Sequence, residues 1–369
     1  MTGSVICVEY ELNDQYLIWL SGISGITARK FHMLLSNLGD ARAIWQEPEL
    51  AKPFLDEKTY KNLISARNEE NFFRLFYMLE KDGITAIPFS SAHYPARLTD
   101  IYDPPAVLYV RGDTNLDFEK AFSVVGTRTP SFDGRKTASA FTQTLAENGV
   151  TVISGLARGV DTIAHESCLN AGGKTIAVLG SGLNRMYPPE NAELAERILA
   201  AGGALVSEML PDEGPQKWSF PMRNRIIAGL SEGVLIVEGR KTSGAMITAA
   251  CALDASREVY AVPGSIYASL SEGPNHLIQN GAFPALSPWD ILEAQRWGTR
   301  PGEAKKAKPD VDLNENEKSI VEKLKIQPLS FDEISKMTQF STQELNSLLT
   351  MLILRGIIIK TPGNSYRLN

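Results

Sequence analysis

Glycine, serine, threonine and arginine recur where short apolar runs of the sequence end. Small residues leave backbone N–H groups uncovered, and a guanidinium binds two phosphate oxygens at once. These positions therefore indicate a site for a phosphate-bearing ligand. Those that follow the first three runs are Gly126, Thr127, Arg128, Ser154, Gly155, Arg158, Gly180, Ser181 and Gly182.

A fourth segment adds two arginines beside an aromatic residue. Pro221 and the apolar spacing after it predict that a helix starts here, with Arg223 and Arg225 in its first turn. Because the helix dipole is positive at that end, an anion should offset the two cations. A carboxylate from Glu208 or Glu238 and a nucleic-acid phosphate both remain open, and they can act together. The candidate binding residues of this segment are Phe220, Arg223, Asn224 and Arg225.

Another helix is predicted to start at Ser243 and Gly244, after the apolar run 234–237. Thr242 or Ser243 can cap it, and Gly244 leaves N–H groups uncovered for a phosphate. The residues do not follow the order G-x-x-x-x-G-K-[ST], so this is not a nucleotide-binding P-loop.

The sequence shows no convincing nucleophile–base pair. His165 lies four residues after Asp161 on one predicted helix, so they are either an acid–base couple or a structural histidine and a helix cap. The four histidines are too scattered to bind a metal, and Gly180-x-Gly182 lacks the third glycine of a dinucleotide fingerprint. We therefore expect no catalytic residue, no metal and no cofactor.

The elements that must position these residues alternate between strand and helix. Strands are expected at 121–125, 150–153, 175–179, 204–206, 234–237 and 259–262, with helices at about 133–148, 161–171, 190–201, 222–231 and 244–255. Strands that are apolar on both faces and alternate with helices predict an α/β fold, a Rossmann-like, doubly wound parallel sheet. Ligands bind beyond the carboxyl ends of such strands, which is where the small residues and arginines lie.

The flanking segments have different patterns. Residues 10–82 are predicted to be helical, and the turn 21–27 is either a phosphate-binding helix–hairpin–helix turn or a simple connection. Residues 313–369 predict three helices and a hairpin around Pro362-Gly363-Asn364, the outline of a winged helix. Its expected recognition helix, Ser341 to Leu354, contains Glu344 and no Lys or Arg, which disfavours the usual binding of duplex DNA. The expected domains are 1–103, 104–298 and 313–369, with a linker at 299–312.

Composition limits the function classes. The chain has 369 residues, 43% hydrophobic and 22% charged, which is typical of a folded globular protein. Its three cysteines lie far apart, no apolar run approaches the ~18 residues of a membrane span, and residues 1–12 lack the cations of a signal peptide. We expect a cytoplasmic protein that binds no membrane. The net charge of −6 excludes a broad basic face, so contacts to a polyanion must be local.

Several long motifs, in one order, resemble the DprA/Smf family. They are Val124–Arg128, Ser154–Asp161, Phe220–Ser231, Ala261–Gly264 and His276–Ala282. The resemblance implies an extended Rossmann domain that binds single-stranded DNA and loads the RecA recombinase in natural transformation. It also implies an N-terminal module of sterile-alpha-motif type, a C-terminal winged helix, and DNA contacts at Arg128, Arg223 and Arg225. Family members form homodimers, and we expect that face near residues 275–286.

Two departures from the family pattern bear on the site. Gly126-Thr127-Arg128 replaces the commoner Gly-Ser-Arg but keeps the hydroxyl. The turn that begins at Gly239 replaces a more usual alanine-containing turn, which leaves the roles of Arg240 and Lys241 open.

We expect a non-catalytic DNA-binding mediator, in which Tyr187 or Phe220 stacks on bases unless both are core residues. Two other functions remain open. A nucleotide-processing enzyme of phosphoribohydrolase type would need a carboxylate at the ribose, for which Glu208 and Glu238 are the candidates. A ligand-sensing regulator would use the winged helix on duplex DNA.

Overall fold

A computed structural model describes residues 10–300, 313–325, 328–338, 340–355, 357–361 and 365–368. The chain divides into two compact units, Met1–Thr299 and Arg300–Asn369. Apart from Thr299 and Arg300, the predicted linker lies outside the described residues.

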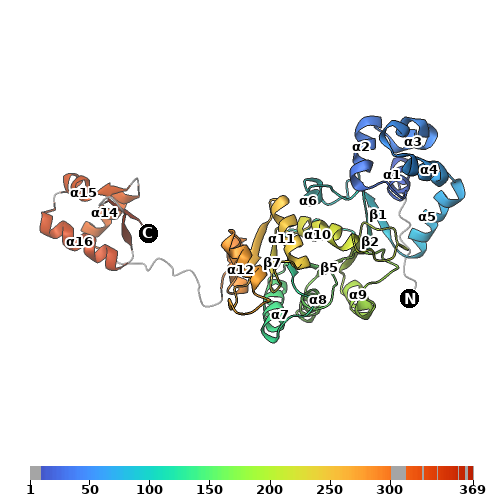
Figure 1. Ribbon diagram of the computed structural model, residues 1–369. Helices are drawn as coiled ribbons and strands as arrows, with labels where there is room; N and C mark the ends of the chain where they lie inside the picture. Colours follow the sequence, from blue (N-terminus) through green and yellow to red (C-terminus); the bar gives the residue numbers. More distant parts are fainter. Residues whose placement is uncertain are drawn as a thin grey trace, which may run out of the picture. The chain divides into compact units, whose positions relative to one another are not determined.

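The first unit is built on a nine-stranded sheet of order β1-β2-β6-β5-β4-β3-β7-β8-β9 (Figure 1). From β6 to β9 all neighbours are parallel, while β2 is antiparallel to β6 and β1 to β2. The predicted doubly wound parallel sheet is confirmed. The strands are β1 (Thr85–Pro88), β2 (Val107–Gly112), β3 (Ala121–Val125), β4 (Thr151–Ser154), β5 (Thr175–Val178), β6 (Ala204–Ser207), β7 (Gly233–Ile236), β8 (Glu258–Ala261) and β9 (Phe283–Pro284).

Helices cover both faces of the sheet (Figure 1). Val125 belongs to the same hydrophobic cluster as Ile226 and Ala249, whereas its neighbour Val124 belongs to the cluster of Leu145 and Ala164. Burial on both faces explains why the strands are continuous apolar runs. One face carries α7 (Phe132–Glu147), α8 (Val160–Asn170), α9 (Ala192–Ala200) and α13 (Pro288–Ala294); the other carries α10 (Ser219–Gly229) and α11 (Gly244–Asp254). Between β8 and β9 lies α12 (Glu272–Gln279).

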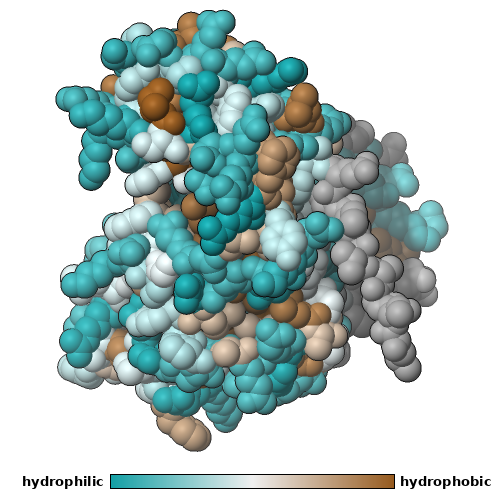
Figure 2. Space-filling model, turned by 90° about the vertical axis from the view of Figure 1, so that its right-hand side faces the viewer, coloured by the Kyte–Doolittle hydropathy of each residue, from teal (hydrophilic) through white to brown (hydrophobic). Residues whose placement is uncertain are grey.

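The N-terminal part of the first unit is helical, as predicted. It contains α1 (Leu12–Ser21), α2 (Ala28–Leu38), α3 (Ala41–Gln46), the 3-10 helix η1 (Pro48–Phe54), α4 (Glu57–Ala66) and α5 (Glu69–Lys81), and a short helix α6 (Ala96–Thr99) follows β1. In the turn 21–27, the Thr27 side chain accepts a hydrogen bond from the Lys30 N–H and so caps α2. On the side that carries these helices, hydrophilic residues predominate and hydrophobic residues form small separate patches (Figure 2).

The second unit is the predicted winged helix. It contains α14 (Glu315–Leu324), β10 (Leu329–Ser330), α15 (Phe331–Met337), α16 (Thr342–Leu354), β11 (Ile358–Thr361) and β12 (Ser365–Leu368). β11 and β12 form the expected antiparallel hairpin; its turn, Pro362-Gly363-Asn364, lies outside the described residues. In the described parts of both units, no helix combines the length and apolar character needed to cross a membrane.

Of the three expected helix starts that bear on the site, the structure confirms the one at Ser243 and Gly244 and corrects the other two. α10 begins at Ser219, so Pro221 is its third residue and Arg223 and Arg225 lie in its second turn. Proline is tolerated there because the first N–H groups of a helix have no partner within it. The argument from the helix dipole therefore does not apply to these arginines. On α8, Gly159 rather than Asp161 is the N-terminal capping residue.

Gly159 lets the loop after β3 lie directly on the start of α8. Its φ of +80° is a conformation that favours glycine. A Cβ at this position would fall 2.4 Å from the Thr127 carbonyl oxygen and 2.6 Å from that of Arg128. The close approach allows the Val160 N–H to donate to the Thr127 carbonyl at 3.2 Å. The backbone that carries Arg128 is thus fixed against α8.

We expect Gly159→Ala to lower the free energy of unfolding by about 3 kcal/mol, since it adds a backbone clash to the positive φ. Gly172→Ala is the matched control, because Gly172 has φ +71° and a methyl group added there would meet no atom within 4 Å. It should cost only about 1 kcal/mol. Urea denaturation measures both, and equal losses would show that the close approach contributes nothing.

Candidate nucleic-acid interface

A pocket opens where the loops after β3, β4 and β5 meet the start of α10. It is small and open to solvent, and it brings together five of the predicted residues, Arg128, Gly155, Arg158, Phe220 and Arg223. Ala157, Tyr187 and Pro188 complete its lining. The pocket lies beyond the carboxyl ends of parallel strands, as the fold predicts.

Arg128 supplies an exposed cation at the pocket. Its guanidinium carbon lies 5.9 Å from the centroid of the Phe220 ring, a cation–π contact. No ion pair joins Arg128 to a carboxylate in the described part of the chain. The Thr127 N–H donates to the Glu238 carbonyl at 2.8 Å and holds the loop. Arg128 is therefore positioned but not neutralised, as a phosphate-binding residue should be.

Arg223 is a second cation, buried in the floor of the pocket and only 5% exposed. Its Nη1 donates to the Gly155 carbonyl at 2.6 Å and also to the Val178 carbonyl. Glycine is required at 155, because a Cβ there would lie 2.4 Å from Nη1. Burial lowers the pKa of Arg223 to about 10, and Asp161 opposes that shift, so the guanidinium is charged at neutral pH.

Asp161 and His165 lie beneath this floor, on α8, and neither lines the pocket. Burial raises the pKa of Asp161 to about 6, although the Arg223 charge acts against the rise. His165 is fully buried, its Nδ1 is 2.7 Å from the Thr175 hydroxyl, and burial lowers its pKa to about 3. The geometry favours the structural role over the acid–base couple.

An aromatic wall stands beside the two arginines. The ring centroids of Tyr187 and Phe220 are 5.4 Å apart, and Tyr187 is 37% exposed. Gly180 makes room for this wall, because a Cβ there would lie 2.9 Å from the Phe220 ring. Tyr187, considered for stacking but not among the predicted binding residues, thus belongs to the pocket. An apolar ring face next to a cation suits a nucleotide, whose base can stack while its phosphate pairs.

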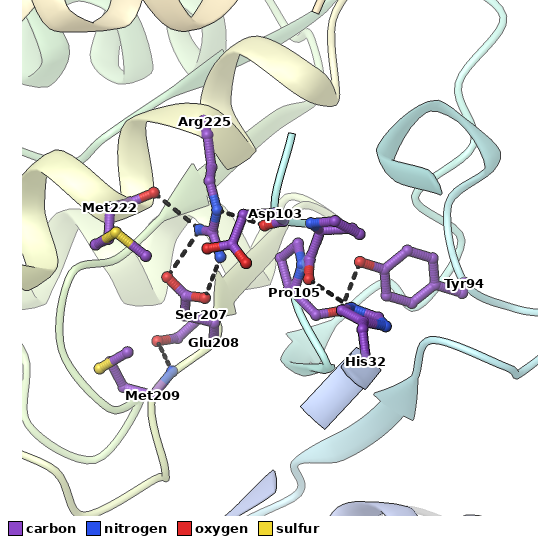
Figure 3. A network of polar contacts seen from close by, with 10 residues as sticks. His32, Tyr94, Asp103, Pro105, Ser207, Glu208, Met209, Met222 and Arg225 are labelled. Carbon is purple, nitrogen blue, oxygen red and sulfur yellow. Dashed lines mark hydrogen bonds and ion pairs between the residues drawn. The ribbon is translucent and has the colours of Figure 1, made fainter. Parts of the chain in front are cut away.

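Arg225 is placed differently from Arg223 and does not line the pocket. Its two terminal nitrogens bind the Glu208 carboxylate at 2.9 and 2.6 Å, and its Nε donates to the Asp103 carbonyl at 2.8 Å (Figure 3). Of the two anions left open by the sequence, the carboxylate of Glu208 therefore neutralises Arg225. Arg225 is therefore engaged within the protein, away from the pocket, and its contact to phosphate stays a prediction.

Other predicted residues support the pocket from behind or lie outside it. The Ser154 hydroxyl is buried and donates to the Val124 carbonyl at 2.7 Å. Asn224 donates to the Gly244 carbonyl at 3.3 Å and accepts from the Arg223 Nε at 3.3 Å, which ties α11 to α10. The predicted residues that do not line the pocket are Gly126, Thr127, Ser154, Gly180, Ser181, Gly182, Asn224, Arg225, Ser243 and Gly244.

Both candidate carboxylates of a nucleotide-processing enzyme are engaged elsewhere. Glu208 pairs with Arg225, and Glu238 accepts hydrogen bonds from the Ser131 N–H at 2.9 Å and the Ser131 hydroxyl at 2.5 Å. The start of α7 is thus already occupied by a carboxylate of the chain itself. The one charged group of the pocket rim with an acidic partner is Arg158, which pairs with Glu190.

Sequence reasoning also passed over Lys217 and Trp218, which precede α10. Both are exposed, Trp218 by 54%. An exposed aromatic residue beside a cation, two positions before Phe220, is a signal that the sequence already contained. Neither residue lines the pocket.

Replacing His165 with glutamine should reduce the loss of unfolding free energy that occurs as the pH falls below 6.5. The folded pKa is about 3 and the unfolded value 6.5, so between these values only the unfolded chain takes up the proton. Stability contributed by this group is full above pH 6.5 and falls, by up to about 1.4 kcal/mol per pH unit, as the pH drops toward 3. Asp161 acts in the opposite direction between about pH 4 and 6, because its folded pKa is raised.

The check is urea denaturation of wild type and His165→Gln from pH 4 to 8. His93→Gln, at an exposed histidine, is the control and should keep the wild-type pH dependence. An unaltered acid slope in His165→Gln would show that this histidine is not the group that titrates.

Comparison with known proteins identifies the family of this chain. The family model described as DNA recombination-mediator protein A matches residues 85–296, more than half of the chain, and the DprA winged helix domain matches residues 304–364. DNA processing protein DprA of Bacillus subtilis is 43% identical over 252 residues, which cover 66% of this chain and 84% of that protein. Protein Smf of Synechocystis is 30% identical over 397 residues, which cover 96% and 99%.

Two solved structures are similar to this one. The X-ray structure of DprA from Streptococcus pneumoniae gives a TM-score of 0.64 at 34% identity and covers 76% of this chain and 97% of that one. DNA processing protein A from Helicobacter pylori, studied for its single-stranded DNA binding mode, gives a TM-score of 0.52 at 29% identity over 58% and 95%. With its sheet, its winged helix and its motifs all matched, the chain belongs to the DprA/Smf family of DNA recombination mediators.

Proposed function

We propose that this protein binds single-stranded DNA and loads RecA recombinase onto incoming DNA in natural transformation, without catalysing a reaction. The observation that carries the proposal is the pocket in which the unpaired Arg128 lies against the Phe220 ring. The Helicobacter pylori relative, which binds single-stranded DNA, supports it.

The pocket chemistry favours a single strand over a duplex. Phe220 and Tyr187 offer ring faces on which a base can stack, but in a duplex each base face is already covered by its neighbours. The phosphate of the same nucleotide would bind the exposed Arg128, above the buried charge of Arg223. Local contacts of this kind are compatible with a net charge of −6.

The engagement of the acidic side chains supports the proposed non-catalytic role. Glu208 and Glu238 are both held by partners within the protein, and neither lines the pocket. Neither of these two carboxylates is therefore available at the pocket. Conversion of nucleoside monophosphates to free base by the purified protein would contradict this part of the proposal.

The partners and location belong to the same proposal. The recombinase contact rests on the family resemblance, and the cytoplasm is where such a recombinase works. We place the homodimer face near residues 275–286, where Phe283 and Leu286 are exposed at the edge strand β9 and its exit. Ile266 and Tyr267, after β8, are exposed as well.

Arg128→Ala should weaken binding of a single-stranded oligonucleotide by about tenfold and reduce the salt slope of log Kd by about 0.7, because one phosphate contact is lost. Fluorescence anisotropy over a salt series measures both. Arg74→Ala, an exposed arginine on α5, is the control and should change neither. Unchanged affinity and slope in Arg128→Ala would contradict the proposed site, and preference for duplex in a competition would favour the winged-helix regulator.

Leu286→Asp should convert the homodimer to a monomer, because it places a charge in an apolar contact. Sedimentation velocity at micromolar concentration measures the change. Leu12→Asp is matched, since Leu12 is another exposed leucine, on α1, and that variant should remain dimeric. A dimeric Leu286→Asp protein would place the interface elsewhere.

A further inference from the structure

The two arginines of α10 face opposite sides of the helix. Arg223 and Arg225 are two positions apart, which is about 200° around an α-helix. Arg223 enters the floor of the pocket, whereas Arg225 turns toward the segment that joins β1 to β2 (Figure 3).

Four of the five N–H donors of Arg225 are used within the protein. Besides the two bonds to Glu208 and the one to the Asp103 carbonyl, its Nη1 donates to the Met222 carbonyl at 2.8 Å. The side chains of the ion pair are 9% and 11% exposed. A buried ion pair of this kind adds little net stability, because both charges lose their water, but it demands one geometry. Its effect is to fix where α10 lies.

The partner of Arg225 on the other side is the segment 102–105. Asp103 has a φ of +59°, a left-handed conformation that is uncommon for residues other than glycine, although aspartate tolerates it better than most. Its carbonyl accepts from Arg225, the Pro104 carbonyl lies 2.9 Å from the His32 Nε2, and the Pro105 carbonyl accepts from the Tyr94 hydroxyl at 2.8 Å (Figure 3). Three successive carbonyls are therefore each contacted by a side chain from a different part of the protein.

The N-terminal helix α2 also contacts the segment 102–105. His32 belongs to α2, and Arg29, one turn earlier on α2, hydrogen-bonds the Tyr102 hydroxyl with its guanidinium carbon 5.5 Å from the Tyr102 ring centroid. The segment 102–105 is thus held by α2 on one side and by Arg225 of α10 on the other.

The end of α10 is also pressed against this region. A Cβ at Gly229, the last residue of α10, would lie 2.6 Å from the Leu98 Cδ2 and 2.9 Å from the Ile101 Cγ2. The helix that carries Phe220 and Arg223 is therefore fixed at its middle and at its end by residues 98–103.

We infer that Arg225 is a positioning residue for the pocket. We also infer that α2 contributes to single-strand affinity through a series of contacts, from His32 to segment 102–105, from that segment to Arg225, and so to α10. The N-terminal helices would then raise affinity without touching DNA. This inference rests on the proposed function, because it concerns the affinity of that same pocket.

The test compares full-length variants by binding to an oligothymidine strand that carries one 2-aminopurine. Arg225→Lys keeps the charge but loses the fork, and Glu208→Gln keeps the shape but loses the charge. Each should weaken binding about threefold to tenfold, the range typical of coupling residues. The salt slope should stay at the wild-type value, because no phosphate contact is lost. The quenching of 2-aminopurine by stacking should decrease, since the Phe220 ring is displaced.

His32→Ala and Tyr94→Phe remove the contacts to segment 102–105 that lie farthest from the pocket, and both leave the ion pair of Arg225 and Glu208 intact. They therefore test the inference even if Arg225→Lys does not fold. Each should weaken binding about threefold with unchanged stoichiometry. His93→Ala is the matched control, an exposed histidine next to Tyr94, and should bind as wild type.

The outcomes separate the inference from the proposed function. If Arg225→Lys lowers the salt slope as Arg128→Ala does, Arg225 contacts phosphate and the inference is overturned. Wild-type affinity and quenching in Arg225→Lys, or in both His32→Ala and Tyr94→Phe, also overturns it, while a weakened Arg128→Ala keeps the proposed function. If wild type fails to bind the strand, or Arg128→Ala binds as wild type does, the proposed function falls and the inference falls with it.

Discussion

The candidate site depends on one buried cation, the Arg223 guanidinium beneath the pocket. A charge can be buried only where dipoles and opposite charge replace its water. Here the carbonyls of Gly155 and Val178 and the carboxylate of Asp161 do so. Burial of this cation also constrains the sequence, because a side chain at residue 155 would collide with the guanidinium and Asp161 of α8 must lie beneath it. The Arg223 guanidinium is therefore held in place before any ligand arrives.

The distribution of neutralised and unpaired cations explains how an acidic chain can bind a polyanion. Arg225 and Arg158 have carboxylate partners within the protein, whereas Arg128 contacts a ring. A ring face leaves the guanidinium charge uncompensated and still holds its position. The net charge of −6 therefore says little about the local field at the pocket, where two cations converge.

The fold could be read from the sequence wherever burial on both faces produces an apolar run. That holds for β3 to β8 but not for β2, whose buried apolar run at 107–110 was not predicted as a strand. β9 has only two residues and β1 ends in a proline directly after a helical segment, so neither gives such a run. Side-chain direction was harder to predict. β4 ends at Ser154, one residue later than expected, which turns that hydroxyl inward. The 223/225 pair illustrates the same limit, because motif spacing shows two arginines but not which faces the pocket.

The winged helix bears on where the proposed DNA-binding site lies. The acidic residue of its expected recognition helix has a structural explanation, since the Glu344 carboxylate accepts from the Ser341 N–H at 2.9 Å and closes a capping box at the start of α16. α16 itself, Thr342–Leu354, carries no Lys or Arg. Insertion of a helix into a duplex groove brings it between two phosphate backbones, and without cations that approach gains nothing from counterion release. The unpaired charge and the aromatic faces lie instead on the Rossmann-like unit, which is why the proposed single-strand site is the pocket at the carboxyl ends of its sheet.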